Sequence, residues 1–329
     1  MGYFCGMYFR CSEIEKRMNE AGQRRQPFLF GVEFEMEEGF FLADPISQQE
    51  VLFNICDVGN TPPPPGTTPP YRFESSPEDF HTYSERFRVV MHGLHRGDSY
   101  LTNLTISTPI RTSLTLQEIF MYSKAKYRLS VPGKMVCFSP ECFVTMQQGK
   151  IATYPMKGTI DATIPNARGI IMNNHKESAE HNTIVDLLRN DLSRIATGVK
   201  VNRFRYIDEL ETSNGPILQV SSEIEGSLPD GYHSHLGSLI FALLPAGSVS
   251  GAPKRATIDL IRRAEKQPRG YYTGVAGYYD GEKLESFVLI RYIEQQEGGL
   301  FFRSGGGITA NSICRNEYRE ALQKVYLPF

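Results

Sequence analysis

Residues 151–159, Ile-Ala-Thr-Tyr-Pro-Met-Lys-Gly-Thr, place one amine between an apolar run and a glycine. The run from Ile151 to Met156 is typical of a buried strand, and Gly158 lets the backbone turn directly after the lysine. We therefore expect Lys157 at the end of a buried strand and not on a solvated helix face. An ammonium group held there is partly desolvated, which favours the neutral, nucleophilic amine.

A carboxylic acid precedes this amine by 16 positions. Glu141 follows the apolar run Met135 to Phe138, so a neighbouring strand could present its side chain to Lys157. An amine nucleophile and a proton donor are the two groups needed to expel a hydroxyl. Either residue alone is more often a solvated or ion-paired surface group. The pair gains meaning only together with the rest of the chain.

The composition is that of an ordinary globular chain of 329 residues, with 35 basic and 37 acidic side chains. No basic stripe or charge block occurs, so nothing indicates a nucleic-acid or membrane partner. The six cysteines include no Cys-x-x-Cys pair, which predicts reduced thiols. No apolar run reaches transmembrane length. We expect a soluble, cytoplasmic protein of about two domains or one large one.

The apolar pattern predicts strands in hairpin-like runs, with helices set between groups of strands. Strands are expected near residues 28–34, 39–42, 100–107, 134–138, 142–147, 150–156, 199–206, 217–224, 271–279, 284–294 and 300–304. Helices are expected near residues 13–26, 77–96, 116–128, 175–196, 232–244, 255–265 and 313–326, with a short helical pattern over 45–56. This order predicts an α+β fold with large antiparallel sheets and not a regular βαβ alternation.

Two Glu-x-x-Glu pairs lie on predicted helices. Glu177 and Glu180 continue the buried stripe of the helix at 175–196, and Glu317 and Glu320 flank the stripe of the last helix. Carboxylates on an inward face are costly unless they are paired or bound to metal. A single pair of this kind is usually a solvated helix face. Two pairs could supply a Mg²⁺ site, because this ion takes one or two carboxylates together with waters and an anionic substrate group.

Cationic and glycine-rich segments could hold anions. Arg291 ends the apolar run 287–290, and Gly305-Gly306-Gly307 follows the next predicted strand, so a guanidinium near bare amides would suit a carboxylate. The plainer alternative is a salt bridge and a tight hairpin. Ser248 and Lys254, in a loop that enters a helix, form another anion-favourable site. Together these groups describe a small substrate with several anionic groups, one carboxylate on Mg²⁺ and another on the arginine and glycines.

From about Gly97 to the C-terminus, the sequence resembles the chorismate-utilising enzymes related to component I of anthranilate synthase. The motifs that carry this resemblance are, in chain order, Gly-Asp-Ser-Tyr (97–100), Ser-Pro-Glu (139–141), Pro-Met-Lys-Gly-Thr (155–159), Ile-Val-Asp-Leu-Leu-Arg-Asn-Asp (184–191), Gly-Ser-Val-Ser-Gly-Ala-Pro-Lys (247–254), Tyr272 with Gly274 to Tyr278, Arg291, Gly-Gly-Gly-Ile (305–308) and Glu-Tyr-Arg-Glu (317–320). The family fold is a sandwich of large antiparallel sheets flanked by helices. The resemblance implies a shortened N-terminal region, residues 1–76, packed on a chorismate-binding catalytic region, residues 77–329.

Within this family, the lysine of Pro-Met-Lys-Gly-Thr resembles aminodeoxychorismate synthase component I, whereas anthranilate synthases usually carry alanine there. The resemblance implies that Lys157 attacks C2 of chorismate, that Glu141 protonates the departing C4 hydroxyl, and that ammonia then enters at C4 in a step of folate biosynthesis. The chain contains no glutaminase signature, so ammonia would come from a separate glutamine amidotransferase subunit or from free ammonium. Anthranilate synthase component I and a catalytically silent binding subunit remain as alternatives.

The resemblance also assigns the remaining site residues. Glu180 and Glu320 match the magnesium ligands of the family, with Glu177 and Glu317 in support. The expected substrate-binding residues are Tyr272, Arg291, Gly305, Gly306, Gly307, Ser248, Thr159, Gln219 and Lys324.

Two positions depart from the family pattern. Leu101 stands where water-adding relatives carry a lysine base and amine-adding relatives usually carry glutamine, which argues against isochorismate or salicylate synthase. Gln219 stands where many relatives place a histidine near the substrate. Glutamine can donate a hydrogen bond there but cannot carry charge.

Overall fold

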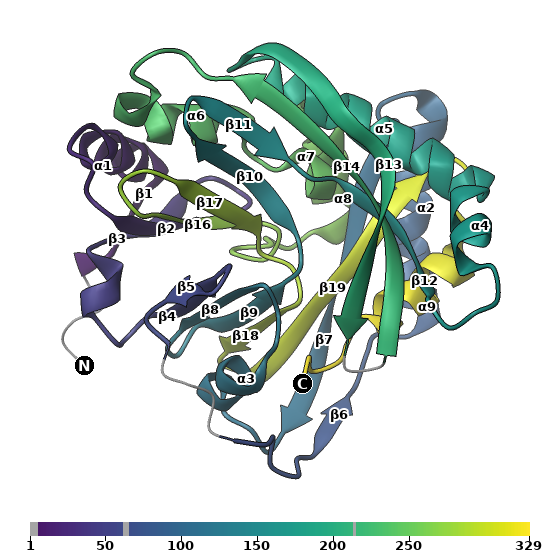
Figure 1. Cartoon of the computed structure of the whole chain (residues 1–329). Coiled ribbons are helices and arrows are strands. Elements are labelled where there is room, and N and C mark those ends of the chain that lie inside the picture. Colours follow the sequence, from purple (N-terminus) through teal and green to yellow (C-terminus); the bar gives the residue numbers. More distant parts are fainter. Residues whose placement is uncertain (1–5, 62–65, 213–214) are drawn as a thin grey trace.

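The computed structural model describes residues 6–61, 66–212 and 215–329. In these ranges the chain forms two large antiparallel β-sheets with helices packed against them (Figure 1). The expected α+β fold with antiparallel sheets flanked by helices is confirmed.

Sheet A is built from three stretches of the chain that lie far apart in sequence. Its strands, as far as the chain is described, lie in the order β1 (Tyr8–Arg10), β3 (Glu38–Ala43), β2 (Phe28–Val32), β16 (Val275–Tyr279), β17 (Leu284–Val288), β10 (Cys142–Gln147), β11 (Lys150–Thr153), β14 (Gly215–Ser227) and β12 (Met156–Asp161), with β13 (Thr197–Thr212) also paired to β14. Strands β2, β16 and β17 are buried along their whole length because both faces of the sheet are covered there.

Sheet B faces part of sheet A and carries the longest strand pair outside β13 and β14. Its described strands lie in the order β15 (Gly251–Ala252), β7 (Leu101–Thr112), β19 (Gly299–Thr309), β18 (Tyr292–Gln296), β9 (Met135–Ser139), β8 (Tyr127–Val131), β4 (Leu52–Ile55) and β5 (Val58–Gly59), with β6 (Phe73–Ser75) paired to β7. In the β7–β19 pair, Thr105 lies opposite Gly305 and Asn103 lies opposite Gly307.

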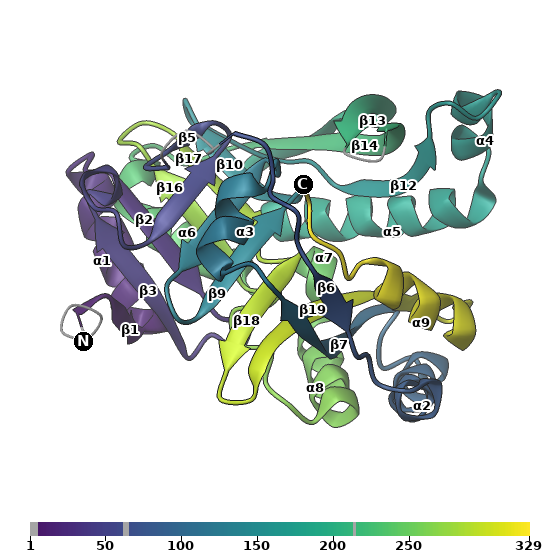
Figure 2. The same cartoon turned by 90° about the horizontal axis from the view of Figure 1, so that it is seen from below.

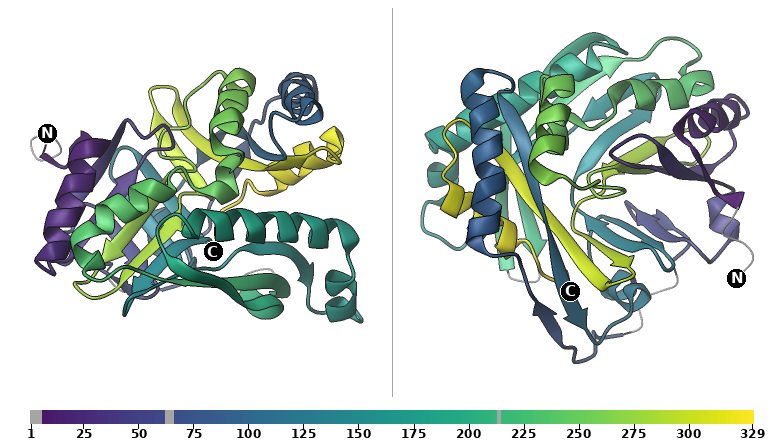
Figure 3. Two further views of the ribbon diagram at one scale, coloured as in Figure 1. Left: turned by 90° about the horizontal axis from the view of Figure 1, so that it is seen from above. Right: turned by 180° about the vertical axis from the view of Figure 1, so that it is seen from behind.

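The helices cover the outer faces of both sheets (Figure 3). One group shares an apolar cluster with sheet A: α1 (Cys11–Gln23), α5 (His175–Leu192) and α6 (Leu236–Leu243). A second group packs near β7 and β19: α2 (Phe80–Arg96), α8 (Lys254–Glu265) and α9 (Cys314–Gln323). The shorter helices are α3 (Leu116–Tyr122), α4 (Ala167–Met172) and α7 (Gly247–Ser250), with 3₁₀ turns at Pro45–Ser47 and Tyr232–His235.

The space between the two sheets is filled with aromatic side chains. Tyr127 of β8 stacks on Phe287 of β17 with ring centroids 5.1 Å apart and ring planes 8° apart. Phe53 of β4 contacts Tyr278 of β16 with centroids 5.2 Å apart. Each contact joins one strand of sheet A to one strand of sheet B, so this aromatic layer holds the two sheets together.

Most predicted elements are present, and the differences are local. The expected helix 116–128 ends at Tyr122 and is followed by β8, and the expected strand 150–156 is divided between β11 and the start of β12. The helical pattern at 45–56 forms only a 3₁₀ turn followed by β4, because Phe53 and Ile55 are buried against β8. The expected strand 284–294 is divided into β17 and β18 by Arg291, whose φ is +54°. The glycine trio lies within β19 and not after it.

Residues 6–61 contribute to both sheets. Strands β1 to β3 extend sheet A beyond β16, whereas β4 and β5 extend sheet B beyond β8. None of the helices in the described ranges has the length and apolar character that a membrane crossing requires. The five cysteines that the structure describes are free thiols, as the sequence predicts.

Candidate active site

A cavity of about 240 Å³ lies where the two sheets diverge, and a second cavity of about 380 Å³ adjoins it. Lys157, Arg291 and Lys324 line both cavities, so three cationic side chains surround one continuous space. Figure 2 shows α5 below β12 on one side of this region and α9 on the other. The ends of strands from both sheets therefore converge on one site.

A β-bulge presents Lys157 to the cavity. The register between β12 and β14 shifts between Met156 and Thr159, and Gly158 has a φ of +83° in the left-handed region. The sequence predicted Lys157 at the end of a strand over 150–156. The structure instead places it near the start of β12. Its Nζ lies 3.4 Å from Oε2 of Glu180, and its side chain is 27% exposed.

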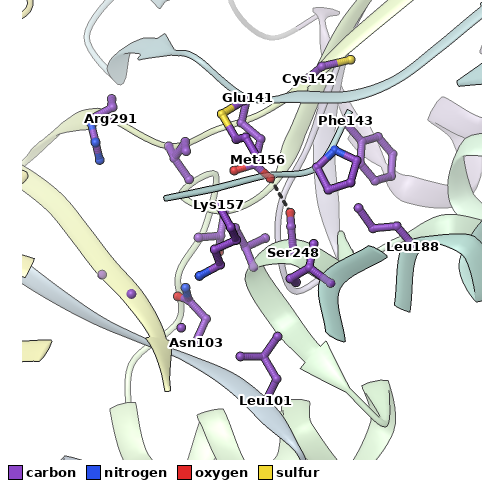
Figure 4. A pocket seen from close by; sticks show the side chains of 18 of the residues that line it. Leu101, Asn103, Glu141, Cys142, Phe143, Met156, Lys157, Leu188, Ser248 and Arg291 are labelled. Carbon is purple, nitrogen blue, oxygen red and sulfur yellow. Dashed lines mark hydrogen bonds between the residues drawn. The ribbon is translucent and has the colours of Figure 1, made fainter. Parts of the chain in front are cut away.

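Glu141 lies in the turn between β9 and β10 and lines the first cavity. The Ser248 hydroxyl of α7 donates a hydrogen bond of 2.5 Å to Oε1 of this carboxyl (Figure 4). Burial raises the pKa of Glu141, although Ser248 and the nearby cations, with Lys157 first among them, act in the opposite direction. Glu141 therefore keeps its proton to a higher pH than an exposed glutamate. The ion pair of Lys157 is with Glu180 and not with Glu141, so the amine and the acid have different partners.

Arg291 stands at the sharp bend between β17 and β18. Its carbonyl accepts a hydrogen bond of 3.0 Å from the amide of Phe138, which fixes the bend against β9. Its guanidinium lies over the ring of Tyr326, 5.7 Å from the centroid. Tyr272 lines the same cavity and is 3% exposed, and burial raises its pKa to about 12, so its hydroxyl stays protonated.

The glycine strand leaves open space beside these cations. A Cβ at Gly306 would lie 3.7 Å from both Oε1 of Glu320 and Nζ of Lys324. A Cβ at Gly307 would lie 3.4 Å from Leu101 and 3.6 Å from Nζ of Lys157. Side chains at these positions would therefore project into the site, and glycine keeps the space for a ligand.

Lys324 connects the glycine strand to α9. Its Nζ donates a hydrogen bond of 2.8 Å to the carbonyl of Gly305 and lies 2.8 Å from Oε1 of Glu320. Burial lowers its pKa, while the Glu320 carboxylate raises it. These contacts place a cation at the boundary between the two cavities.

The two Glu-x-x-Glu pairs meet across the second cavity. Glu177 and Glu180 approach it from α5, and Glu317 and Glu320 approach it from α9. No three His, Cys, Asp or Glu side chains in the described ranges are grouped closely enough to hold a metal ion. Carboxylate oxygen is nevertheless the ligand type that Mg²⁺ prefers, so the donor type fits this ion. In this structure two of the carboxylates, Glu180 and Glu320, form ion pairs with lysines.

The structure brings nearly all of the expected site residues together, and Gln219 is the exception. Gln219 is buried on β14 opposite Thr159, which lines the second cavity, but Gln219 lines neither cavity. The expected anion site at Ser248 and Lys254 is also wrong. Lys254 forms an ion pair of 2.9 Å with Asp191 and donates a hydrogen bond to the carbonyl of Leu243. It therefore connects α8 to α5 and α6 and is not available to an anion.

Asn103 is a site residue that the sequence analysis missed. It lines the first cavity from β7, near Leu101 and Lys157 (Figure 4). Its Oδ1 is buried without a hydrogen-bond partner in the described residues. The available signal was weak: a polar residue at an inward position of the strand that begins at Leu101.

Comparison with known proteins places the chain among related sequences. The family model described as "chorismate binding enzyme" matches residues 27–328. An "Uncharacterized PabA-like protein" of Haemophilus influenzae is 46% identical over 314 residues, which cover 95% of this chain and 95% of that protein. Aminodeoxychorismate synthase component 1 of Salmonella typhimurium is 32% identical over 280 residues, 79% of this chain but only 60% of that protein.

A solved structure shares the fold across nearly the whole chain. The menaquinone-specific isochorismate synthase of Escherichia coli superposes with a TM-score of 0.71 over 97% of this chain and 82% of that chain. The sequence identity is 15%, so the likeness is one of fold.

Proposed function

The chain belongs to the chorismate binding enzyme family, and we propose that it is a component I of aminodeoxychorismate synthase, which converts chorismate and ammonia to 4-amino-4-deoxychorismate. The observation that carries this proposal is the shared cavity of Lys157 and Glu141. One side chain supplies an amine and the other a carboxylic acid whose pKa is raised by burial. A nucleophile and an acid are the groups required to replace a hydroxyl by an amine.

The charges around the cavity support a substrate with two carboxylates, as chorismate has. Arg291 and Lys324 lie beside the open backbone of Gly305 to Gly307 and suit one carboxylate. Tyr272, which lines the same cavity, adds a buried hydroxyl donor. The second carboxylate would lie toward the glutamates of α5 and α9, which would hold Mg²⁺.

Four protein groups would carry out the reaction. Lys157 attacks C2 of the ring, and the two double bonds shift so that the C4–O bond breaks. Glu141 gives its proton to the departing hydroxyl, which leaves as water. Ammonia then attacks C4, the double bonds return, and the bond to Lys157 breaks. Ser248 stabilises the carboxylate that Glu141 becomes, and Arg291 holds the substrate in place through its carboxylate.

The proposed magnesium ligands are Glu180 and Glu320, with Glu177 and Glu317 in support. Bound Mg²⁺ would neutralise the substrate carboxylate that faces these glutamates. Because Glu180 and Glu320 are paired with Lys157 and Lys324 in this structure, metal binding would compete with these two ion pairs.

The ammonia source in this proposal is a separate glutamine amidotransferase subunit, or free ammonium in its absence. The name "component 1" of the Salmonella relative supports a partner subunit. Anthranilate synthase component I is the nearest alternative, because it uses the same two substrates. Lys157 favours the first function, since direct amination at C2 requires no covalent lysine nucleophile.

A product assay tests the proposal. Purified protein is incubated with chorismate, Mg²⁺ and ammonium, with and without an aminodeoxychorismate lyase. We expect 4-aminobenzoate only when the lyase is present. Anthranilate and pyruvate formed without lyase would replace the proposal by anthranilate synthase, and the absence of any chorismate consumption would favour a silent binding subunit.

The covalent step has a separate test. Lys157→Ala should lose most of the product, and mass spectrometry of the wild type with chorismate should find an adduct on the peptide that contains Lys157. Lys150→Ala is the matched control, because Lys150 is exposed on β11, the strand that precedes β12 in the chain, and pairs with Glu225. Wild-type rates in Lys157→Ala, together with no trapped adduct in the wild type, would mean that Lys157 acts only by its charge.

A further inference from the structure

Arg269 is a cation buried outside the cavity, in the segment between α8 and β16. Its side chain is 1% exposed, and its guanidinium lies 4.5 Å from the centroid of the Phe34 ring. A buried guanidinium needs partners for all five of its N–H groups. The substrate-binding groups described above do not include it, so its placement requires another explanation.

The five N–H groups of Arg269 make five hydrogen bonds. Nε and Nη2 donate to the two carboxylate oxygens of Glu265, at 2.9 and 2.7 Å. Nη2 also donates to the carbonyl of Asn103, at 2.8 Å. Nη1 donates to the carbonyl of Val249, at 3.0 Å, and to the hydroxyl of Thr273, at 3.3 Å. The donor capacity of the side chain is therefore fully used.

Three of these acceptors belong to three separate walls of the first cavity. Asn103, Val249 and Thr273 all line it, and they come from β7, α7 and the segment before β16. The guanidinium of Arg269 thus joins three segments that are distant in the sequence. Asn103 and Val249 are 146 positions apart, and Val249 and Thr273 are 24 positions apart. Arg suits this role because its donors have a fixed planar geometry.

Each wall carries a group that the proposed reaction uses. Val249 follows Ser248, which hydrogen-bonds to Glu141. Thr273 follows Tyr272, and its hydroxyl donates to the Tyr272 carbonyl at 2.6 Å. Asn103 lies opposite Gly307 in the β7–β19 pair. A shift of Arg269 would therefore move the acid, the tyrosine and the glycine strand relative to one another.

Glu265 completes this arrangement at the edge of sheet B. Its Oε1 accepts a hydrogen bond of 2.9 Å from the amide of Thr105, two residues beyond the Asn103 carbonyl that Arg269 holds. The short strand β15 pairs only with Leu101 and Thr102. Further along β7 no strand pairs with this edge at Asn103 and Thr105 in the described residues. There Arg269 donates to the Asn103 carbonyl and Glu265 accepts from the Thr105 amide, in place of a neighbouring strand.

We propose that Arg269, supported by Glu265, is a positioning residue that sets the relative geometry of the Ser248, Tyr272 and glycine-strand walls of the active site. This inference rests on the proposed function, because it assigns those walls to one reaction. It predicts a defect in turnover of a folded protein and not only a loss of stability. A displacement of about 1 Å between reacting groups can cost on the order of 100-fold in rate.

The test is Arg269→Lys, which keeps the charge beside Glu265 but cannot reproduce the planar set of five bonds. Well below its unfolding temperature, this variant should show a kcat reduced about 10- to 100-fold, with the KM for chorismate changed less than about threefold. The control is Arg86→Lys. Arg86 donates to the carbonyl of Thr105 on the same strand and pairs with Glu78, but it does not line the cavity. Its kcat should stay within about twofold of the wild type.

A milder pair of variants keeps the test valid if Arg269→Lys does not fold. Thr273→Val removes the hydroxyl that links Arg269 to Tyr272, whereas Thr273→Ser retains it. We expect a loss of kcat in the valine variant and its recovery in the serine variant. A wild-type kcat in folded Arg269→Lys would overturn the inference. If Arg269→Lys does not fold, a wild-type kcat in Thr273→Val would overturn it instead. Equal losses of kcat in Arg269→Lys and Arg86→Lys would also overturn it. If the wild type converts chorismate to another product, the proposed function fails, and the same kcat ratios for that product still test Arg269.

Discussion

At the scale of single residues, Glu141 must be protonated to act as the proposed acid. The groups around it set its pKa and therefore the highest pH at which it keeps its proton. Burial raises its pKa, and the hydrogen bond from Ser248 lowers it, because the hydroxyl stabilises the ionised carboxylate. Activity should therefore fall as the pH rises through the pKa of Glu141. Ser248→Ala removes the stabilising bond, raises this pKa further and should move the alkaline limb of the kcat profile to higher pH.

The control for this pH shift is Ser250→Ala. Ser250 lies on the same short helix, but its hydroxyl donates to the carbonyl of Ala246 and not to Glu141. The measurement is kcat against pH at saturating chorismate for both variants. An alkaline limb that stays in place, or moves to lower pH, in Ser248→Ala would show that Glu141 is not the titrating acid.

Arg291 allows a prediction about substrate binding. Its positive φ directs the side chain into the cavity at the bend between β17 and β18. Arg291→Lys keeps the charge but loses the planar fork, so the KM for chorismate should rise about tenfold or more, with a smaller change in kcat. Arg203→Lys is the control, because Arg203 is stacked on Tyr206 and lies outside both cavities. An unchanged KM would assign Arg291 to the bend alone.

Three of the residues that the sequence analysis found share one property: each follows or ends an apolar run. Lys157, Glu141 and Arg291 could be singled out from the sequence for this reason. Arg269 could not, because Gln-Pro-Arg-Gly resembles an exposed loop. Its partner Asn103 lies 166 positions away, and no local pattern encodes that contact.

At the scale of elements, α5 and α9 form the two sides of the proposed magnesium site. Each helix supplies one Glu-x-x-Glu pair to the second cavity. Glu180→Gln and Glu320→Gln should weaken Mg²⁺ binding in the presence of chorismate by about tenfold or more, because an amide is a poor ligand for a hard cation. Calorimetric titration with Mg²⁺ measures this directly. The control is Glu85→Gln on the exposed face of α2.

Full affinity for Mg²⁺ in either variant would remove that residue from the site. An unchanged unfolding temperature is expected in Glu85→Gln, since its pairing with Arg88 is exposed.

Strands and helices were predicted well where the apolar period ran unbroken, and poorly where a single residue bends the chain. The strands on both sides of Arg291 were predicted as one strand, 284–294, whereas the backbone turn at this residue assigns them to different sheets. The segment 45–56 has a helical period, yet pairing of β4 with β8 overrides it. In both segments, 284–294 and 45–56, the pairing of strands within the folded sheets determined the secondary structure and not the local apolar period.

At the scale of the whole molecule, the cavity exists because two sheets share a core at one end and diverge at the other. Strand pairs join segments from the beginning, middle and end of the chain in each sheet. The antiparallel α+β class followed from the sequence. The strand order did not, because β2 pairs with β16 across about 245 positions, as in the register of Val32 with Val275 and Phe28 with Tyr279.

This pairing predicts that residues 77–329 do not fold alone. Without the N-terminal segment, β16 would lose its neighbour β2, and Tyr278 would lose its contact with Phe53. The exposed edge and apolar faces should cause aggregation. Gel filtration and near-ultraviolet circular dichroism of the truncated chain measure the outcome.

A cut chain separates the loss of contacts from the loss of covalent connection. Residues 61–70 of the sequence contain six prolines. A protease site inserted between Gly66 and Thr67 interrupts this segment at two residues that are both exposed. After cleavage, the two pieces should elute together and retain chorismate turnover, because the pairing of β2 with β16 and of β4 with β8 remains. A truncated chain that is monomeric, folded and active would instead show that residues 77–329 form an independent domain. Separation of the cleaved pieces with activity in the larger one would lead to the same conclusion.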